Sequence, residues 1–217
     1  MLEITEITSF EEFIKLQFEW NELLEQCEND SVFLRHEWFK VWWQNFNSNK
    51  NLLVILVREK RVLIGIAPLM LVTEKIGNIR PFPSRQIRFI ENSVAPHTDF
   101  IINNYRIDVL RVIFNHLESI RHKWDIMILH KLPKESLIFS KNPNLYRSGL
   151  RFEIQQVINN PVLRPKCEWN SYFSSRSKRV RGAVRNSRTG LKKQVPLTLR
   201  ILHQPVMLSH FYKKYGT

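Results

Sequence analysis

The sequence is poor in cysteine and has no long apolar run. Its two cysteines, Cys27 and Cys167, lie far apart, which argues against a disulfide framework or a cysteine-rich metal site and favours a reducing compartment. The longest nearly unbroken apolar run, residues 62–72, is too short for a bilayer, which takes about 20 residues. The acidic, amphipathic N-terminus does not have the pattern of a signal peptide. We therefore expect a cytoplasmic protein with no transmembrane segment.

Metal-ligand spacing is also lacking. Neither the pair His116 and His122 nor the pair His203 and His210 has a third ligand type nearby at a spacing that suits a metal ion. We therefore predict no metal site.

Acidic residues stop at Glu168. Residues 169–217 carry 11 Lys/Arg and no Asp or Glu, whereas the first 168 residues carry 22 Lys/Arg against 20 Asp/Glu. Almost all of the net charge of +13 therefore lies in the last quarter of the chain. Pro161 and Pro165 fall just before this change in composition, so we predict a first domain over residues 1–160 and a different, basic segment over 161–217.

Apolar residues are abundant, at 43% of the chain, and their spacing alternates between helix and strand. Helical spacing predicts helices over residues 10–27, around Trp38, Trp42 and Phe46, and over 107–120. Continuous apolar runs at 52–57 and 62–69, joined by a charged turn, predict a hairpin, with Pro68 at a sheet edge or a strand bend. Further strands are predicted at 86–90, 99–102, 124–129 and 151–158. The predicted fold is α/β, in α+β layers: a mixed, mostly antiparallel sheet flanked by helices.

The basic segment predicts a short helix from Trp169, a new N-cap at Ser177 and a helix over 178–193. Four cations of this helix share one face and are candidate anion contacts: Arg181, Arg185, Arg188 and Lys192. A narrow stripe of Val180, Val184 and Leu191 lies beside them. The face could be solvated, could meet a phosphate-bearing cofactor or substrate, or could bind nucleic acid. Nucleic acid is disfavoured, because no aromatic residue lies between Lys178 and Lys193 to stack on bases.

Several short motifs, taken in order, resemble the CelD/BioF-like acetyltransferases, which are related to the GNAT acyltransferases. These motifs are Phe33-Leu34 with Trp38 and Trp42, Ile64-Gly65-Ile66-Ala67-Pro68-Leu69, Asp99-Phe100-Ile101, Trp124-Asp125-Ile126 followed by Leu132-Pro133, and Trp169 through Tyr172 and Phe173 to Arg181 and Arg185. Each motif is weak alone. Their order and spacing carry the resemblance over residues 9–215.

The resemblance implies two acyltransferase-type halves in tandem, similar to the FemABX enzymes, with this chain holding a GNAT-like first half and the opening of a second, incomplete one. A helix at 206–215 would close the segment. The resemblance also implies acetyl-CoA or another acyl-CoA as donor, and an amine or hydroxyl acceptor on a small molecule or a glycan-type envelope precursor.

One expected feature of the family is missing. A glycine-rich loop normally cradles the pyrophosphate of the coenzyme at a helix N-terminus, but no two of the six glycines here lie within five residues of each other. We therefore expect the second half to hold the cofactor, and little or no activity from these 217 residues alone. The alternative is a non-enzymatic module whose basic end binds nucleic acid or another anionic surface.

Catalytic residues are not assigned by the sequence. Asp99 is the most suggestive acid, because a strand start in an apolar setting would raise its pKa, although Asp is also a common turn residue. Asp125 has the same status, and Glu37 is expected at the surface. Both cysteines are expected to be unreactive, since no His is placed beside either of them.

Overall fold

The computed structural model describes residues 1–27, 31–75, 82–91, 95–103, 106–139, 153 and 167–194. The chain divides into two compact units, Met1–Glu153 and Ile154–Thr217. The boundary predicted at residue 160 and the helix predicted at 206–215 lie outside the described residues, as does the strand predicted at 151–158 apart from Glu153. No helix in the described ranges is long and apolar enough to cross a membrane.

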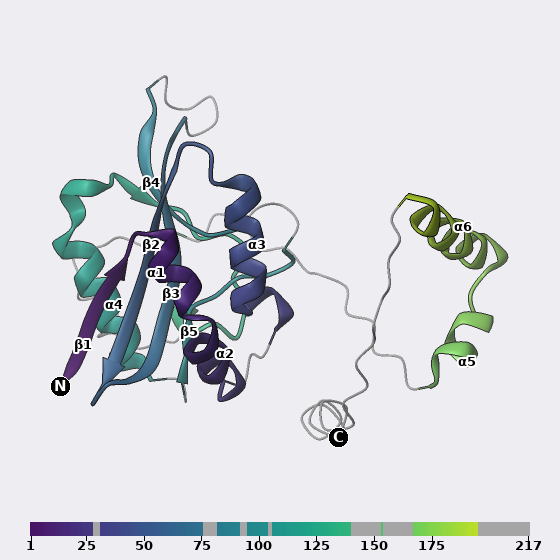
Figure 1. Ribbon diagram of the computed structural model, residues 1–217, viewed down its shortest axis with the longest axis horizontal. Coiled ribbons are helices and arrows are strands. Elements are labelled where there is room, and N and C mark those ends of the chain that lie inside the picture. The colour runs from purple at the N-terminus through teal and green to yellow at the C-terminus, as the bar shows by residue number, and fades with distance from the viewer. Residues whose placement is uncertain are drawn as a thin grey trace. The chain divides into compact units, whose positions relative to one another are not determined.

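A mixed sheet is the centre of the first unit (Figure 1). Its strands run in the order β1-β2-β3-β4-β6, and β5 pairs with β3 beside this path. The bounds are β1 Leu2–Ile7, β2 Lys50–Glu59, β3 Val62–Glu74, β4 Ser84–Phe89, β5 Ile101–Ile102 and β6 Ile126–Met127. Only β4 and β6 pair in parallel, and the other recorded pairs are antiparallel. The predicted layered fold with a mostly antiparallel sheet is confirmed.

The predicted hairpin is the longest pairing in this sheet. β2 and β3 pair from Lys50↔Val72 to Glu59↔Val62, with a bulge next to Val57. The turn has only two residues, Lys60 and Arg61, and both have positive φ, at 49° and 70°. Positive φ at both positions is the geometry of a two-residue hairpin turn, which normally selects Asn and Gly. The buried apolar runs of β2 and β3 therefore fix the register of the hairpin, although the residues of the turn do not favour it.

β1 is a strand that the sequence reading missed. It pairs antiparallel with β2 at the edge of the sheet, and its side chains alternate between the two faces. Leu2 and Ile4 pack on one face of the sheet and Ile7 on the other. Glu3, Thr5 and Glu6 lie between these apolar residues, so the segment has the low apolar content of a half-exposed edge strand.

Three helices cover one face of the sheet: α1 (Phe10–Lys15), α2 (Gln17–Glu25) and α3 (His36–Phe46). A single helix was predicted over 10–27, but it is interrupted at Leu16. The carbonyl oxygen of Phe13 accepts hydrogen bonds from the amide of Leu16, at 3.1 Å, and from Nε2 of His36, at 2.9 Å. A side chain that enters the helical hydrogen-bond ladder breaks it, which accounts for the two short helices.

α4 (Ile107–Ser119) covers the opposite face (Figure 1). Its buried residues pack on Leu53, Ile55 and Val57, whose neighbours along β2 face the other helices, so the sheet is buried on both sides. Gly65 lies beneath this helix. A Cβ atom at Gly65 would collide with a γ-methyl carbon of Val109. The glycine therefore allows α4 to approach the strand closely.

The second unit contains α5 (Trp169–Ser174) and α6 (Lys178–Gln194), both as predicted. Ser177 acts as the N-cap of α6: its hydroxyl accepts from the amide of Val180, at 3.4 Å, and its carbonyl from the amide of Arg181, at 3.0 Å. A third contact ties the helices together, since a guanidinium nitrogen of Arg181 donates to the carbonyl of Ser174, at 2.7 Å.

Candidate functional site

The candidate site lies where the chain leaves the sheet between β4 and β5. Both strands pair with β3, but the register jumps from Leu69↔Phe89 to Ile66↔Ile101. β3 thus advances by three residues while the opposite chain advances by twelve. The excess residues form an excursion, of which 90–91 and 95–100 are described.

Pro68 lies at this interruption. On one side it pairs with Val54 inside the central hairpin, so it is not at the outer edge of the sheet. On the other side its carbonyl accepts from the amide of Ile90, at 2.9 Å. The N–H and C=O of an antiparallel residue point to the same side, so the reciprocal bond would need an N–H that proline lacks. The strand therefore tolerates proline because its missing donor falls where pairing ends.

The excursion is fastened to the segment that follows β6. The ammonium of Lys131 donates to the carbonyl of Ala95, at 2.6 Å, and forms an ion pair with Glu91, at 3.2 Å. The amide of Thr98 donates to the carbonyl of Lys131, at 3.2 Å, and the Thr98 hydroxyl donates to the carbonyl of His130, at 3.0 Å. The amide of Ile128 still donates to β4, at the carbonyl of Ile87, 2.9 Å away. Two residues later the chain bonds to Thr98.

Asp99 is the buried carboxyl group of this segment, with 7% of its surface exposed. Its Oδ1 accepts from the hydroxyl of Ser136 and from the amide of Phe100, both at 2.8 Å. Burial raises the pKa of Asp99 to about 7, against the opposing effect of these two hydrogen bonds. The apolar setting and the raised pKa agree with the expectation from the sequence, but the strand predicted at 99–102 begins only at Ile101, so Asp99 precedes it. The carboxyl also holds the turn at Ser136 in place.

His97 is the other titratable group of the excursion. Burial lowers its pKa, so its ring is neutral at neutral pH. The ring lies edge-on to Phe33, with centroids 6.0 Å apart. No hydrogen bond or ion pair between His97 and Asp99 is recorded among the described residues, so the two do not form an acid–base pair in this structure.

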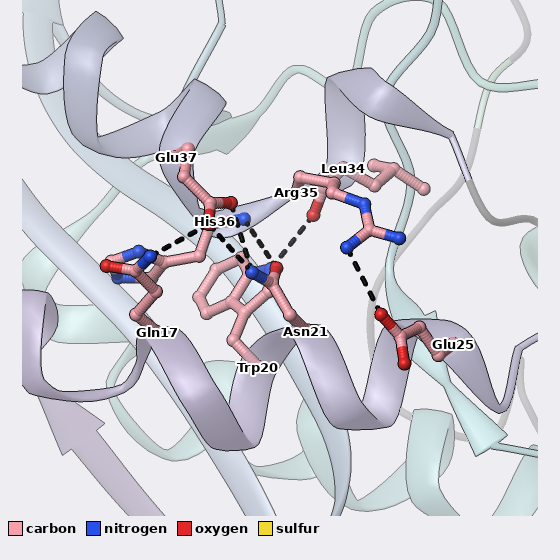
Figure 2. A network of polar contacts seen from close by, with 8 residues as sticks. All are labelled: Gln17, Trp20, Asn21, Glu25, Leu34, Arg35, His36 and Glu37. Carbon is pink, nitrogen blue, oxygen red and sulfur yellow. Dashed lines mark hydrogen bonds and ion pairs between the residues drawn. The ribbon is translucent and has the colours of Figure 1, made fainter. Parts of the chain in front are cut away.

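The two other sequence candidates are structural. Asp125 forms a bidentate pair with the guanidinium of Arg85, at 2.7 and 3.2 Å, and also accepts from the Arg85 amide, at 2.8 Å. It therefore ties β6 to β4. Glu37 is exposed as predicted, and its carboxylate accepts from the side-chain amides of Gln17 and Asn21, at 2.8 to 3.0 Å (Figure 2). It fastens α3 to α2.

Beside this network, His36 is fully buried. Its ring stacks on Phe13, with centroids 4.5 Å apart, and burial lowers its pKa. The neutral ring donates from Nε2 to the Phe13 carbonyl, while Nδ1 has no hydrogen-bond partner among the residues that the structure describes. Trp20 lies across the same junction and donates to the carbonyl of Leu34, at 2.8 Å (Figure 2). This centre joins α1, α2 and α3.

The N-terminus of α4 is the strand-to-helix turn that could meet a phosphate. Asp108 lies in the first turn of α4. Arg106, the residue before the helix begins, forms ion pairs with Asp108 and with Glu59, each at 2.7 Å. The guanidinium of Arg106 lowers the pKa of both carboxyls. A carboxylate already occupies the positive end of the helix, and the nearby cation is engaged by two acids. The described residues of this turn therefore do not fit the pyrophosphate of coenzyme A.

The four predicted anion contacts lie on α6, but their described partners are internal. Arg181 caps α5, and the guanidinium of Arg185 lies over the ring of Phe173, 5.8 Å from its centroid. Arg188 and Lys192 belong to the same helix, and their side chains lie outside the described residues. Neither contact was readable from the sequence, because both depend on how α5 folds back on α6.

The two cysteines differ in their surroundings. Cys27 is buried and donates to the carbonyl of Leu23, at 3.3 Å, while Cys167 is exposed. The described part of the chain contains no group of His, Cys, Asp and Glu that could hold a metal ion.

The sequence matches no protein-family model and no curated protein sequence. Similar solved structures include an acetyltransferase from Trypanosoma brucei, with 13% identity and a TM-score of 0.44 over 74% of this chain and 100% of that one. Others are a possible acetyltransferase from Clostridium difficile, with 11% identity and a TM-score of 0.43 over 76% and 99%, and glucosamine-6-phosphate N-acetyltransferase from Arabidopsis thaliana, with 14% identity and a TM-score of 0.38 over 74% and 98%. These values are too low to assign an activity to this chain.

Proposed function

We propose that this chain forms part of an acyl-CoA-dependent acyltransferase that acylates an amine or hydroxyl on a small molecule or a glycan-type envelope precursor. In this proposal residues 1–160 are a GNAT-like half, of the kind that the CelD/BioF-like resemblance implies, and residues 161–217 open a second half. One observation carries the proposal. The sheet is antiparallel except for β4 and β6, which pair in parallel and are joined through α4.

The same region supports placing the coenzyme outside this half. The strand-to-helix turn before α4 carries Asp108 and an engaged Arg106 where a pyrophosphate would need free donors. Ile128 is the last residue after β6 with a described bond to β4, and residues 130–131 bond to Thr98 of the excursion. In this proposal the half keeps the framework of an acyltransferase, and its described residues do not form a coenzyme cradle. We therefore derive no catalytic step through coenzyme A here.

The first test is coenzyme binding by the full 217-residue chain. Titration calorimetry with coenzyme A and acetyl-CoA, and a free-thiol assay with amine and hydroxyl acceptors, should show no binding at millimolar ligand and no turnover. Rapid acetyl-CoA turnover would overturn the placement of the cofactor. If binding appeared, Arg106→Ala would decide its location, because loss of binding in that variant would place the coenzyme at α4.

The second test concerns the class of enzyme itself. The reading frame that follows residue 217 in the source genome should continue into a second α/β half that carries a glycine-rich strand-to-helix turn. A polypeptide that includes this half should bind acetyl-CoA, and should lose binding when the glycines of the turn are replaced. A continuing domain of another fold would refute the proposed class, whatever the 217-residue chain binds.

A further inference from the structure

His36 occupies the joint between α1 and α2. In an unbroken helix the carbonyl of Phe13 would accept from the amide of Gln17, but α1 ends at Lys15 and α2 begins at Gln17. The Phe13 carbonyl accepts instead from Nε2 of His36, at 2.9 Å, and from the amide of Leu16, at 3.1 Å. A side chain of α3 therefore takes the place of one helical hydrogen bond.

Apart from this contact, the two helices have the features of a single one. The buried apolar residues on both sides of the joint recur at the spacing of one continuous helix: Phe13, Leu16, Trp20, Leu23 and Leu24. Leu16, at the joint, has a φ of −78° and a ψ of −5°, close to the right-handed helical region. Joining α1 to α2 therefore needs a small backbone change at Leu16 and keeps the same apolar face buried.

The site of the His36 ring accommodates the neutral form alone. The ring is fully buried, stacks on Phe13 and meets Trp20 edge-on, with centroids 5.6 Å apart. Because a carbonyl oxygen only accepts hydrogen bonds, Nε2 carries the proton, and Nδ1 has no partner among the described residues. A second proton would create at Nδ1 a charged donor without an acceptor, which is costly in a buried site. Protonation therefore favours the exit of the ring from the joint.

The charges that act on the ring lie on its own helix. Burial lowers the pKa of His36, the Phe13 carbonyl and Glu37 raise it, and Lys40 lowers it further. The charged side chains of α1 and α2 are all exposed, and residues 32–34, which precede α3, carry none. No other charged group is recorded as acting on the ring among the described residues.

The charged groups nearest the joint keep their ionisation while the ring titrates. Burial raises the pKa of Glu37, but the hydrogen bonds from Asn21 and Gln17 outweigh this effect and the net shift is downward. Glu37 is therefore ionised throughout the range in which a histidine titrates. Arg35, directly before α3, forms an ion pair with Glu25, at 3.3 Å (Figure 2).

We propose that His36 is a pH-operated latch: its neutral ring keeps α1 and α2 apart, and on protonation it leaves the joint, so that the Gln17 amide bonds to the Phe13 carbonyl and the two helices become one. The side chain of Gln17 also donates to Glu37, at 2.8 Å, so joining the helices changes how α3 is fastened to α2 (Figure 2). This inference does not rest on the proposed acyltransferase activity, because it concerns the conformation of these helices alone.

The test is NMR spectroscopy of the full chain from pH 7.5 to 5, with the His36 ring and the Gln17 amide as probes. Below pH 6.5, the ordinary pKa of histidine, the ratio of joined to latched molecules should rise by up to about tenfold per pH unit, because the two states differ by one bound proton. The amide and Cα shifts of Gln17 report this ratio. The indole N–H of Trp124, which donates to the Leu117 carbonyl on the opposite face of the sheet, should not change.

Two variants hold the joint in one state each. In His36→Gln the side-chain amide can donate to the Phe13 carbonyl and does not titrate, so the helices should stay apart at every pH. In His36→Leu the side chain cannot donate, so the helices should be joined already at pH 7.5. The matched control is His122→Gln, which removes an exposed histidine and should keep the wild-type response.

Several results would overturn the inference. One is a Gln17 amide that stays unbonded at pH 5, whether the His36 ring is protonated there or still neutral. Another is the same pH response in His36→Gln as in the wild type, since the histidine would then not be its cause. An interrupted helix in folded His36→Leu would show that the ring does not keep the helices apart. Loss of exchange protection at Gln17 and Trp124 together would show acid unfolding of the first unit in place of a latch.

Discussion

Replacing Asp99 by Asn tests the buried carboxyl directly. Asn is nearly isosteric, and its Oδ1 can keep both hydrogen bonds, from Ser136 and from the Phe100 amide. The variant therefore removes the titration while it preserves the packing. Any difference between the two proteins that depends on pH then belongs to the ionisation of Asp99.

The magnitude follows from the pKa shift. Folding raises the pKa of Asp99 from 3.8 to about 7, so the folded state binds the proton more tightly than the unfolded state. The stability that this proton contributes is fully present below pH 3.8 and is lost as the pH rises through 7. At about 1.4 kcal/mol per pKa unit, the loss is about 4 kcal/mol, complete slightly above pH 7.

The assay is urea unfolding of both proteins at a series of pH values from 4 to 8.5. The free energy of unfolding of Asp99→Asn minus that of the wild type should rise by about 1.4 kcal/mol per pH unit between pH 4 and 7, and then level off. Asp108→Asn is a control of opposite sign. Arg106 lowers the pKa of Asp108, so that variant should be the less stable protein at neutral pH, and the difference should shrink in acid.

A flat difference between Asp99→Asn and the wild type from pH 4 to 8.5 would refute the reasoning. It would mean that Asp99 is solvated in the folded protein, and that the excursion between β4 and β5 opens to water. A constant penalty in Asp99→Asn at every pH would have another meaning, since it would show that the new amide nitrogen is buried without an acceptor.

Three further variants test other parts of the fold. Gly65→Ala should cost about 1–3 kcal/mol of stability by forcing α4 away from β3, whereas Gly182→Ala, with no atom within 4 Å of the added Cβ, should cost nothing in the same thermal melt. The pair Lys60→Asn/Arg61→Gly should raise the Tm by about 2–4 °C, because both residues have positive φ in the hairpin turn; an unchanged Tm would mean that the turn is not strained. Burial lowers the pKa of His36, so wild-type stability should fall as the pH drops below 6.5, and His36→Gln should abolish that part of the pH dependence in urea unfolding; an identical slope in both proteins would contradict the burial.

The parts of the fold that could be predicted are those with a strong local pattern. The hairpin has two continuous apolar runs, α4 has an apolar face of regular spacing, and α6 begins at a serine cap. β1 was missed because the pattern of a short edge strand, with Glu and Thr on alternate positions, is weak by itself. The break at Leu16 could not be predicted, because its cause is His36, which reaches it from another helix.

The site divides in the same way. The raised pKa of Asp99 was predicted from its immediate neighbours, because the apolar strand that follows it ensures burial. The partners that hold the region in place were not predicted. Lys131 reaches Ala95 and Glu91, and Arg106 reaches Glu59, across long sequence separations that only the assembled sheet brings together. The positive φ of Lys131 marks a turn, but it is a property of the backbone that the residue type does not signal.

Pro68 has a consequence for how this sheet can change. A continuous strand in place of β4 and β5 would need a donor from residue 68, and proline offers none. A continuous ladder across the excursion would therefore lack one hydrogen bond at residue 68, whatever the length of the loop. Changes of chain length between Phe89 and Ile101 should therefore leave the two flanking registers unchanged, provided that the buried residues Ile90, Ala95, Thr98 and Asp99 keep their places.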